Sequence, residues 1–138
     1  EKIFLTLSWA AYLKDWEGPE RGERPSAYIV MLGDKKISSN YLADPGIAMT
    51  YILLSAVEKG LGGCIIATID RKKLREILNI AEEYEILYVI ALGEPKETIV
   101  LEDLNENGDI KYYRDDEQIH HVPKRSLQEI IVGRYIAE

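Results

Sequence analysis

The chain has 138 residues, enough for one domain with its own hydrophobic core and no need of a disulfide or metal. Hydrophobic residues make up 46% and charged residues 30%, which is typical of a folded soluble chain. The net charge of −7 argues against a general nucleic-acid-binding protein and against docking on an anionic membrane. The single cysteine, Cys64, excludes an internal disulfide and favours a reducing, cytoplasmic location. No segment reaches the roughly 18–20 apolar residues of a membrane span.

The first part of the chain predicts a helix, a loop and a strand. Residues 3–13 carry apolar side chains at helical spacing, and residues 15–25 are rich in charge, Gly and Pro, which predicts a surface loop. Residues 27–32 form a continuous apolar run between Pro25 and Gly33. Such a run is typical of a strand covered on both faces.

The longest predicted helix covers residues 44–59. Asp44 followed by Pro45 is a favourable helix start, and Gly60 is a suitable C-terminal cap. Apolar residues surround this helix, so we expect it to be buried on every side. A second subunit would cover its outer side most easily.

The remaining elements are short. We expect a buried strand at residues 64–67, a helix from Asp70 to about residue 79 and a strong strand at residues 84–92. Asn107-Gly108 predicts a β-hairpin between residues 99–101 and 110–113, followed by a helix at about residues 126–132. These elements together predict an α+β fold.

Two local patterns have open alternatives. Gly60-Leu61-Gly62-Gly63 follows a helix and precedes a strand, the reverse of a dinucleotide-binding fingerprint. It indicates a helix cap with a tight turn, or a close approach of backbone to a ligand. Lys124-Arg125 stands just before a helix start at Ser126. Adjacent cations with free helix-start N–H groups indicate a phosphate site, and the alternative is a plain surface pair.

Other candidate residues carry weaker signals. Residues 103–108 match the first half of a calcium loop, but the required Glu at its twelfth position is Arg114. His120 and His121 are adjacent and point apart, so we expect a loop rather than a metal pair. Cys64 is expected to be buried. Three aromatic residues are either core or interface residues or the lining of a pocket: Trp9, Tyr12 and Trp16.

Seven short motifs occur in order between about residues 4 and 131. They are Trp9-Ala10-x-Tyr12-Leu13, Gly22-Glu23-Arg24-Pro25, Asp44-x-Gly46-Ile47-Ala48, Gly60-Leu61-Gly62-x-Cys64, Leu74-Arg75-x-Ile77-Leu78, Ala91-Leu92-Gly93-x-Pro95 and Pro123-Lys124-Arg125-x-Leu127. In this order and spacing they resemble the FMN-dependent nitroreductase family. Each motif alone is weak, and the seven in register are fairly specific.

The resemblance implies a single nitroreductase-like domain over residues 1–138. Its α+β fold would have a central mixed or antiparallel sheet, flanking helices and a buried dimer-core helix. The family forms homodimers with FMN at the subunit interface. NAD(P)H reduces the flavin, which then reduces a nitroaromatic, a quinone or a similar small-molecule acceptor. Neither nucleic acid nor a membrane is expected as a partner.

The resemblance also implies which residues bind the cofactor. Six would pass along the isoalloxazine: Gly62, Gly63, Ile65, Ile66, Ala67 and Thr68. A backbone donor to flavin N5 would come from Ala67 or Thr68, and Lys124 and Arg125 would bind the FMN phosphate. No catalytic side chain and no metal site are expected, because the flavin carries the chemistry.

One departure from the family pattern leaves an alternative open. Family members begin with an Arg-x-Ser-x-Arg-like phosphate arm and a Pro-Ser-x-x-Asn loop, and neither motif occurs in this sequence. We therefore expect an N-terminally truncated flavoenzyme. The alternative is a shortened, non-catalytic dimeric module that binds flavin or a small anion on the same fold.

Overall fold

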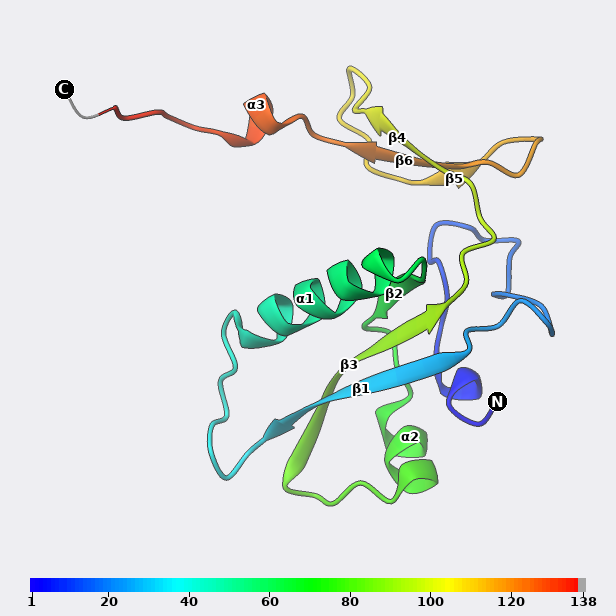
Figure 1. Cartoon of the computed structure of the whole chain (residues 1–138), viewed down its shortest axis with the longest axis vertical. Helices are drawn as coiled ribbons and strands as arrows, with labels where there is room; N and C mark the ends of the chain where they lie inside the picture. The colour runs from blue at the N-terminus through cyan, green and yellow to red at the C-terminus, as the bar shows by residue number, and fades with distance from the viewer. Residues whose placement is uncertain (137–138) are drawn as a thin grey trace. The chain divides into compact units, whose positions relative to one another are not determined.

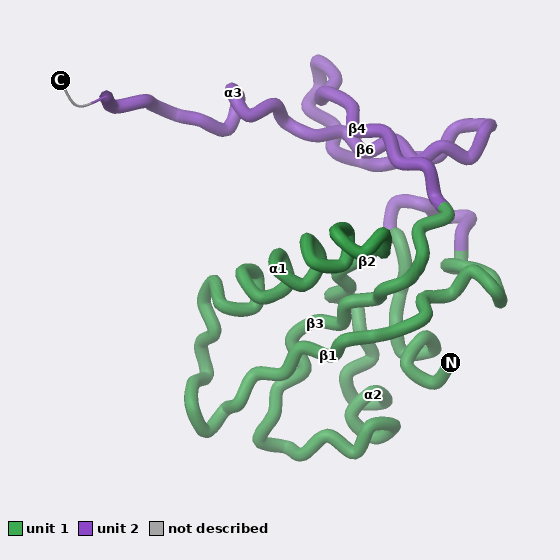
Figure 2. The backbone as a smooth tube through the Cα atoms, in the orientation of Figure 1, with its two compact units in different colours: residues 1–10, 17–96 green, residues 11–16, 97–138 purple. Residues whose placement is uncertain are grey.

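The computed structural model describes residues 1–136 and divides the chain into two compact units (Figure 2). Unit 1 holds residues 1–10 and 17–96, and unit 2 holds residues 11–16 and the chain from residue 97. Each unit is described by itself below. The single domain expected over the whole chain stays a prediction.

Unit 1 is built on a three-stranded antiparallel sheet. Its strands are β1 (Ala27–Asp34), β2 (Gly62–Ile66) and β3 (Tyr84–Gly93), in the order β1-β3-β2 (Figure 1). The sequence of β3 is almost continuously apolar, which suits the central position. The predicted strands at residues 27–32 and 84–92 are therefore confirmed. The expectation that residues 27–32 are covered on both faces is wrong for this chain by itself, because β1 is an edge strand and Ile29 and Leu32 are exposed.

Helices cover both faces of this sheet. Helix α1 (Asp44–Glu58) packs against β2 and β3, with Met49 and Ala56 buried. The opposite face carries α2 (Arg71–Leu78) and the short 3-10 helix η1 (Phe4–Thr6). That side holds the main core cluster, which consists of Ile66, Ile69, Leu74, Ile86, Val89 and Ala91.

The predicted helix boundaries follow from local capping. Gly60 has φ +74° and donates its N–H to the Val57 carbonyl at 2.9 Å, which ends α1 as expected. The Asp70 side chain accepts the N–H of Lys73 at 3.0 Å and caps α2. Asn79 ends α2 in the left-handed region, at φ +52°.

The helix predicted at residues 3–13 is wrong. Only η1 is helical, because the backbone that follows it pairs with another segment. Ser8 donates its N–H to the Thr68 carbonyl at 3.0 Å, and Asp70 donates to the Thr6 carbonyl at 2.8 Å. These non-local hydrogen bonds satisfy groups that a helix would have paired within itself.

The expectation that α1 is buried on every side is also wrong for this chain by itself. Four apolar residues of α1 are 55–70% exposed: Ile47, Tyr51, Leu54 and Val57. Their spacing of four, three and three residues places them on one stripe, on the outer side of the helix. The sheet covers only the opposite side.

Unit 2 contains a small mixed sheet and a short helix. The sheet has β4 (Ile99–Asp103), β5 (Tyr113–Arg114) and β6 (His120–Lys124), in the order β4-β6-β5. Strand β4 runs parallel to β6, and β5 runs antiparallel to it. Helix α3 (Leu127–Ile130) follows, shorter than predicted.

The predicted hairpin is wrong. The turn itself forms, since Gly108 has φ +67° and donates its N–H to the Asn105 carbonyl at 2.9 Å. Its two flanking strands, β4 and β5, do not pair with each other, because β6 lies between them. The fold class is α+β, as predicted.

Candidate functional site

The glycine-rich segment has a structural explanation in unit 1. Gly63 lies where α1 crosses β2, and a Cβ built there would be 2.4 Å from Cδ2 of Leu53 and 2.8 Å from Cδ2 of Leu92. Gly62 has more room, with Cβ of Pro95 at 3.2 Å. With Gly60 as the cap of α1, the structure supports the cap and tight-turn interpretation, and close helix packing adds a reason for Gly63.

The segment that follows lies at an edge of the sheet. Within residues 1–136, β2 has a strand on one side only, namely β3. Ile66 points into the core and is buried, whereas Ile65 is 41% exposed and Ala67 and Thr68 are exposed. The predicted ring-binding segment therefore presents apolar side chains and a sheet edge at the surface.

Cys64 is a further correction. We expected a buried thiol, and the structure places an exposed one on β2. The apolar run at residues 64–67 is typical of a central strand, which is covered by its neighbours. Strand β2 lies at an edge of the sheet instead, so its side chains are less covered.

The two predicted phosphate ligands lie in unit 2. Lys124 is the last residue of β6, and Arg125 joins β6 to α3. Both side chains are exposed, and within residues 1–136 neither forms an ion pair. They remain available for an anion.

The start of α3 contributes fewer free N–H groups than the sequence predicts, because those of Ser126 and Glu129 are occupied. Ser126 and Glu129 form a capping box, in which the Ser126 N–H donates to the Glu129 carboxylate at 2.6 Å. The Ser126 hydroxyl accepts the Glu129 N–H at 3.4 Å. The hydrogen bond from the Ser126 backbone lowers the pKa of Glu129, so this carboxylate stays ionised. An anion there must rely on Lys124 and Arg125.

These two cations border an open cavity of about 480 Å³ in unit 2. Its lining consists of Tyr12, Ile110, Tyr112, Val122, Pro123, Lys124, Arg125 and Ile130. The rings of Tyr12 and Tyr112 meet edge to face at 4.9 Å between centroids. Such a cavity can hold the charged end of a ligand at its cations and an apolar or aromatic body against its walls.

Of the three aromatic residues singled out in the sequence, only Tyr12 lines this cavity. Trp9 packs against the core of unit 1, and Trp16 lies under the guanidinium of Arg114 at 4.5 Å. Ile110, Tyr112 and Val122 were missed. Nothing in their local sequence distinguishes them from ordinary strand or loop residues.

The histidine pair lies in β6 and not in a loop. Its side chains do point apart: His121 contacts Glu102 and Asp115, whereas Nδ1 of His120 lies 3.0 Å from Glu97. In the part of the chain that the structure describes, no group of three or more His, Cys, Asp or Glu residues is suited to a metal. No helix of residues 1–136 is long and apolar enough to cross a membrane.

The predicted cofactor residues thus fall into two groups. Gly62, Gly63, Ile65, Ile66, Ala67 and Thr68 belong to unit 1, whereas Lys124 and Arg125 belong to unit 2. Their assignment to a cofactor stays a prediction.

The chain is an α+β protein with a helix over each face of an antiparallel sheet. The model of the nitroreductase family matches residues 17–94, which include β1, α1, β2, α2 and β3. The chain belongs to the nitroreductase family, a family of oxidoreductases. The recognition made from the seven motifs is therefore confirmed.

Two solved structures are similar to the chain. One is a nitroreductase family protein from Clostridium novyi NT, with a TM-score of 0.52 and 21% identity over 93% of this chain and 66% of that one. It supports the fold. The other is an FMN-dependent nitroreductase from Clostridium difficile R20291, with a TM-score of 0.49 and 30% identity over 53% of this chain and 47% of that one. The chain thus spans between about half and two thirds of these proteins. No curated protein matches it significantly.

Proposed function

We propose that the chain is part of a homodimeric flavoenzyme that binds FMN. It would pass hydride from NAD(P)H through the flavin to a nitroaromatic, a quinone or a similar small acceptor. One observation carries this proposal: the nitroreductase family match spans residues 17–94 and so includes the segment from Gly62 to Thr68. Bound FMN would supply the redox chemistry, and the protein would supply binding and orientation.

The surface around β2 fits an isoalloxazine ring. A planar aromatic ring needs an apolar contact surface and backbone groups at its polar edge. Ile65 supplies exposed apolar area, and Ala67 and Thr68, which are exposed residues, directly follow the edge strand. We propose that Ala67 or Thr68 donates its N–H to flavin N5, which favours the electron-rich reduced ring.

Lys124 and Arg125 fit a phosphate. They are adjacent, exposed and without ion pairs in the part of the chain that the structure describes, in a protein of net charge −7. Two local cations in an acidic protein favour a small, doubly charged anion over a polyanion. We propose that they bind the FMN phosphate.

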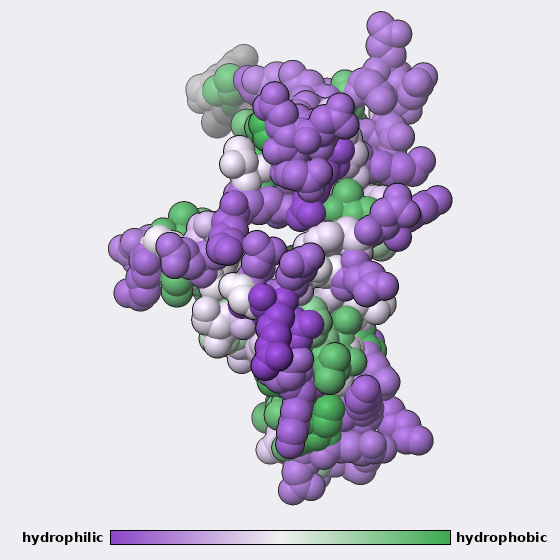
Figure 3. Space-filling model, turned by 90° about the vertical axis from the view of Figure 1, so that its right-hand side faces the viewer, coloured by the Kyte–Doolittle hydropathy of each residue, from purple (hydrophilic) through white to green (hydrophobic). Residues whose placement is uncertain are grey.

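A second copy of this chain fits the remaining apolar surface. The stripe of α1 that contains Ile47, Tyr51, Leu54 and Val57 is exposed, and so are Val132, Tyr135 and Ile136 near the C-terminus. Hydrophobic atoms also reach the surface among hydrophilic ones in the space-filling view (Figure 3). Exposed apolar surface of this extent is typical of an interface. We propose that the homodimer contact covers the stripe of α1.

The experiment that tests the proposal is an absorbance spectrum of the purified protein, recorded before and after FMN is added and excess removed by desalting. We expect close to equimolar flavin in a dimeric fraction, and bleaching of its visible bands by NAD(P)H. A folded dimer that retains no flavin would contradict FMN binding by this chain. Flavin that is retained but never bleached would favour a non-catalytic binding module.

Lys124→Ala tests the phosphate site directly. We expect the FMN dissociation constant to rise about tenfold, the usual effect of losing one charge-assisted hydrogen bond. Lys72→Ala is the matched control, because Lys72 is an exposed lysine on α2 without an ion pair in residues 1–136. Equal FMN affinity in both variants would remove Lys124 from the site.

A further inference from the structure

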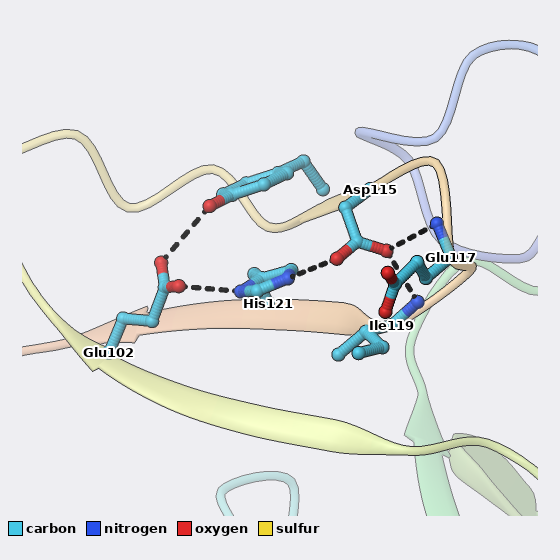
Figure 4. Close-up of polar contacts among 6 residues, drawn as sticks. Glu102, Asp115, Glu117, Ile119 and His121 are labelled. Carbon is cyan, nitrogen blue, oxygen red and sulfur yellow. Dashed lines mark hydrogen bonds and ion pairs between the residues drawn. The ribbon is translucent and has the colours of Figure 1, made fainter.

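One imidazole joins all three strands of unit 2. His121 on β6 has Nδ1 2.5 Å from Glu102 Oε1 on β4, and Nε2 3.1 Å from Asp115 Oδ2 just after β5 (Figure 4). The ring of Tyr113 on β5 stacks on the imidazole at 4.8 Å, and its hydroxyl donates to Glu102 Oε2 at 3.3 Å. These four side chains form the cluster that we call the His121 network.

Asp115 is held in place for this contact. Its other carboxylate oxygen accepts the backbone N–H of Glu117 at 3.0 Å and of Ile119 at 2.8 Å (Figure 4). The carboxylate therefore belongs to the turn between β5 and β6 and cannot swing away without breaking that turn.

The geometry favours a protonated imidazole. A neutral histidine has one N–H, whereas the ring of His121 faces a carboxylate oxygen at each nitrogen. Only the imidazolium can donate to both Asp115 and Glu102. Hydrogen bonds to Asp115 and then Glu102 raise the pKa of His121 above its ordinary value, and the bond from His121 lowers the pKa of Asp115.

The network joins two segments that line the cavity. The first segment holds Ile110 and Tyr112, which lie shortly before β5, and the second runs from Val122 to Arg125, directly after His121. Strand β5 is two residues long and pairs with β6 only at Tyr113 with His121 and at Arg114 with His120. The contacts of His121 therefore help to hold the first segment against the second.

Two charged groups near β5 and β6, Arg114 and Glu97, lie around His120 and not around His121. Arg114 donates to Glu97, and Nδ1 of His120 lies 3.0 Å from the same carboxylate. The groups that face His121 are Glu102 from β4, Asp115 from the turn and the phenol of Tyr113 from β5.

We propose that protonated His121 stabilises the assembled cavity through its hydrogen bonds. Anion binding at Lys124 and Arg125 then weakens as the pH rises and His121 loses its proton. Once neutral, His121 leaves one carboxylate facing a lone pair, and β5 loses a main attachment. The proposal rests on the proposed function, because it assigns a regulation to the same phosphate site. Its direction is opposite to that of the ligand, since a phosphate monoester gains charge above about pH 6 and would by itself bind more tightly.

The first test needs no ligand. The full chain, uniformly labelled with 13C and 15N, is titrated by NMR between pH 5.5 and 9.5. We expect the imidazole of His121 to titrate above pH 6.5, and the backbone amides of Tyr112 and Val122 to shift with the same midpoint. A midpoint at or below the ordinary histidine value would overturn the proposal. So would amide shifts that do not follow it.

Acidic variants sharpen this test. Glu102→Gln and Asp115→Asn each remove one charge beside the imidazole, so each should lower the midpoint of His121. Asp116→Asn is the matched control: it removes the same charge one residue away, and in residues 1–136 the Asp116 carboxylate makes no hydrogen bond or ion pair. An equal effect of Asp115→Asn and Asp116→Asn would contradict the proposal, because it would show that the overall negative charge, and not the hydrogen bond to Asp115, sets the midpoint of His121.

The second test measures FMN affinity by flavin fluorescence at pH 6.5 and pH 9. For the wild-type chain we expect the dissociation constant to rise about tenfold between the two pH values. His121→Arg stays charged and should show no such rise, and His121→Gln should bind weakly at both pH values. An equal affinity of the wild type at both values would overturn the proposal. If no form binds FMN, the proposed function fails. The titration without ligand still decides whether protonated His121 stabilises the cavity.

Discussion

Replacing Gly63 with alanine tests how α1 is packed on the sheet of unit 1. The new Cβ would lie 2.4 Å from Cδ2 of Leu53, 2.8 Å from Cδ2 of Leu92 and 3.3 Å from the Ala91 carbonyl oxygen. Carbon atoms pack at about 3.5–4.0 Å, so both methyl groups must move by about 1 Å. Overpacking costs about 1–3 kcal/mol, and Gly63→Ala should lie near the lower end of that range, because both leucine contacts are with the ends of partly exposed side chains that can turn away.

Thermal and urea denaturation measure this cost. A loss of about 1 kcal/mol lowers the Tm of a chain of this length by roughly 3–5 °C. Gly46→Ala is the control, because Gly46 lies on the same helix and a Cβ there meets nothing within 4 Å. That variant should keep its stability or gain up to about 1 kcal/mol, since alanine favours a helix. An unchanged Tm in Gly63→Ala beside a normal Gly46→Ala would refute the packing of α1 against β2.

Two further predictions concern α2. Leu74→Ala should lower the free energy of unfolding by about 2–5 kcal/mol, because Leu74 is fully buried in the core cluster, and a loss under about 1 kcal/mol in urea denaturation would contradict that packing. Asp70→Ala should cost about 1 kcal/mol by removing the N-cap, whereas Asp70→Asn, an equally good cap, should stay near the wild type. Equal Tm values for the two Asp70 variants would show that the cap contributes nothing.

Elements governed by neighbours in the sequence were predictable. Gly60 and Asp70 are such cases, because a cap is a contact between residues three or four positions apart. The prediction of a helix at residues 3–13 failed for the opposite reason: its backbone pairs with Thr68 and Asp70, sixty or more residues away. Helical spacing of apolar side chains cannot reveal that a distant segment will take the same N–H groups.

The hairpin prediction was wrong for the same reason, because a turn is local structure and strand pairing is not. Asn107-Gly108 does form its turn, as its sequence indicates. A turn signal says nothing about whether the flanking strands pair, and β6, which comes later in the chain, lies between them. Turn chemistry is therefore a prediction about four residues and not about a sheet.

One feature of the candidate site, the capping box of α3, was predictable from the sequence, and another, the cavity, was not. Ser126 and Glu129 have the spacing of a capping box, so the sequence alone could have shown that the start of α3 is occupied by a carboxylate. The cavity could not be foreseen, because Tyr12 and Tyr112 stand one hundred positions apart. Only the cations, Lys124 and Arg125, had a local signal.

Two of the errors in predicted burial, at α1 and at β2, carry information about partners. An apolar sequence predicts that a residue will be covered, without indicating by what. In the described chain, the outer stripe of α1 and the edge strand β2 remain exposed although both were expected to be buried. Leaving such residues in water has a cost that local structure does not repay. These are the two surfaces that the proposed second subunit and the proposed flavin would cover.

Hydrogen exchange addresses both surfaces in one experiment. A dimer that binds FMN should protect the amides of α1 and of residues 62–68 from exchange, and a monomer without flavin should not.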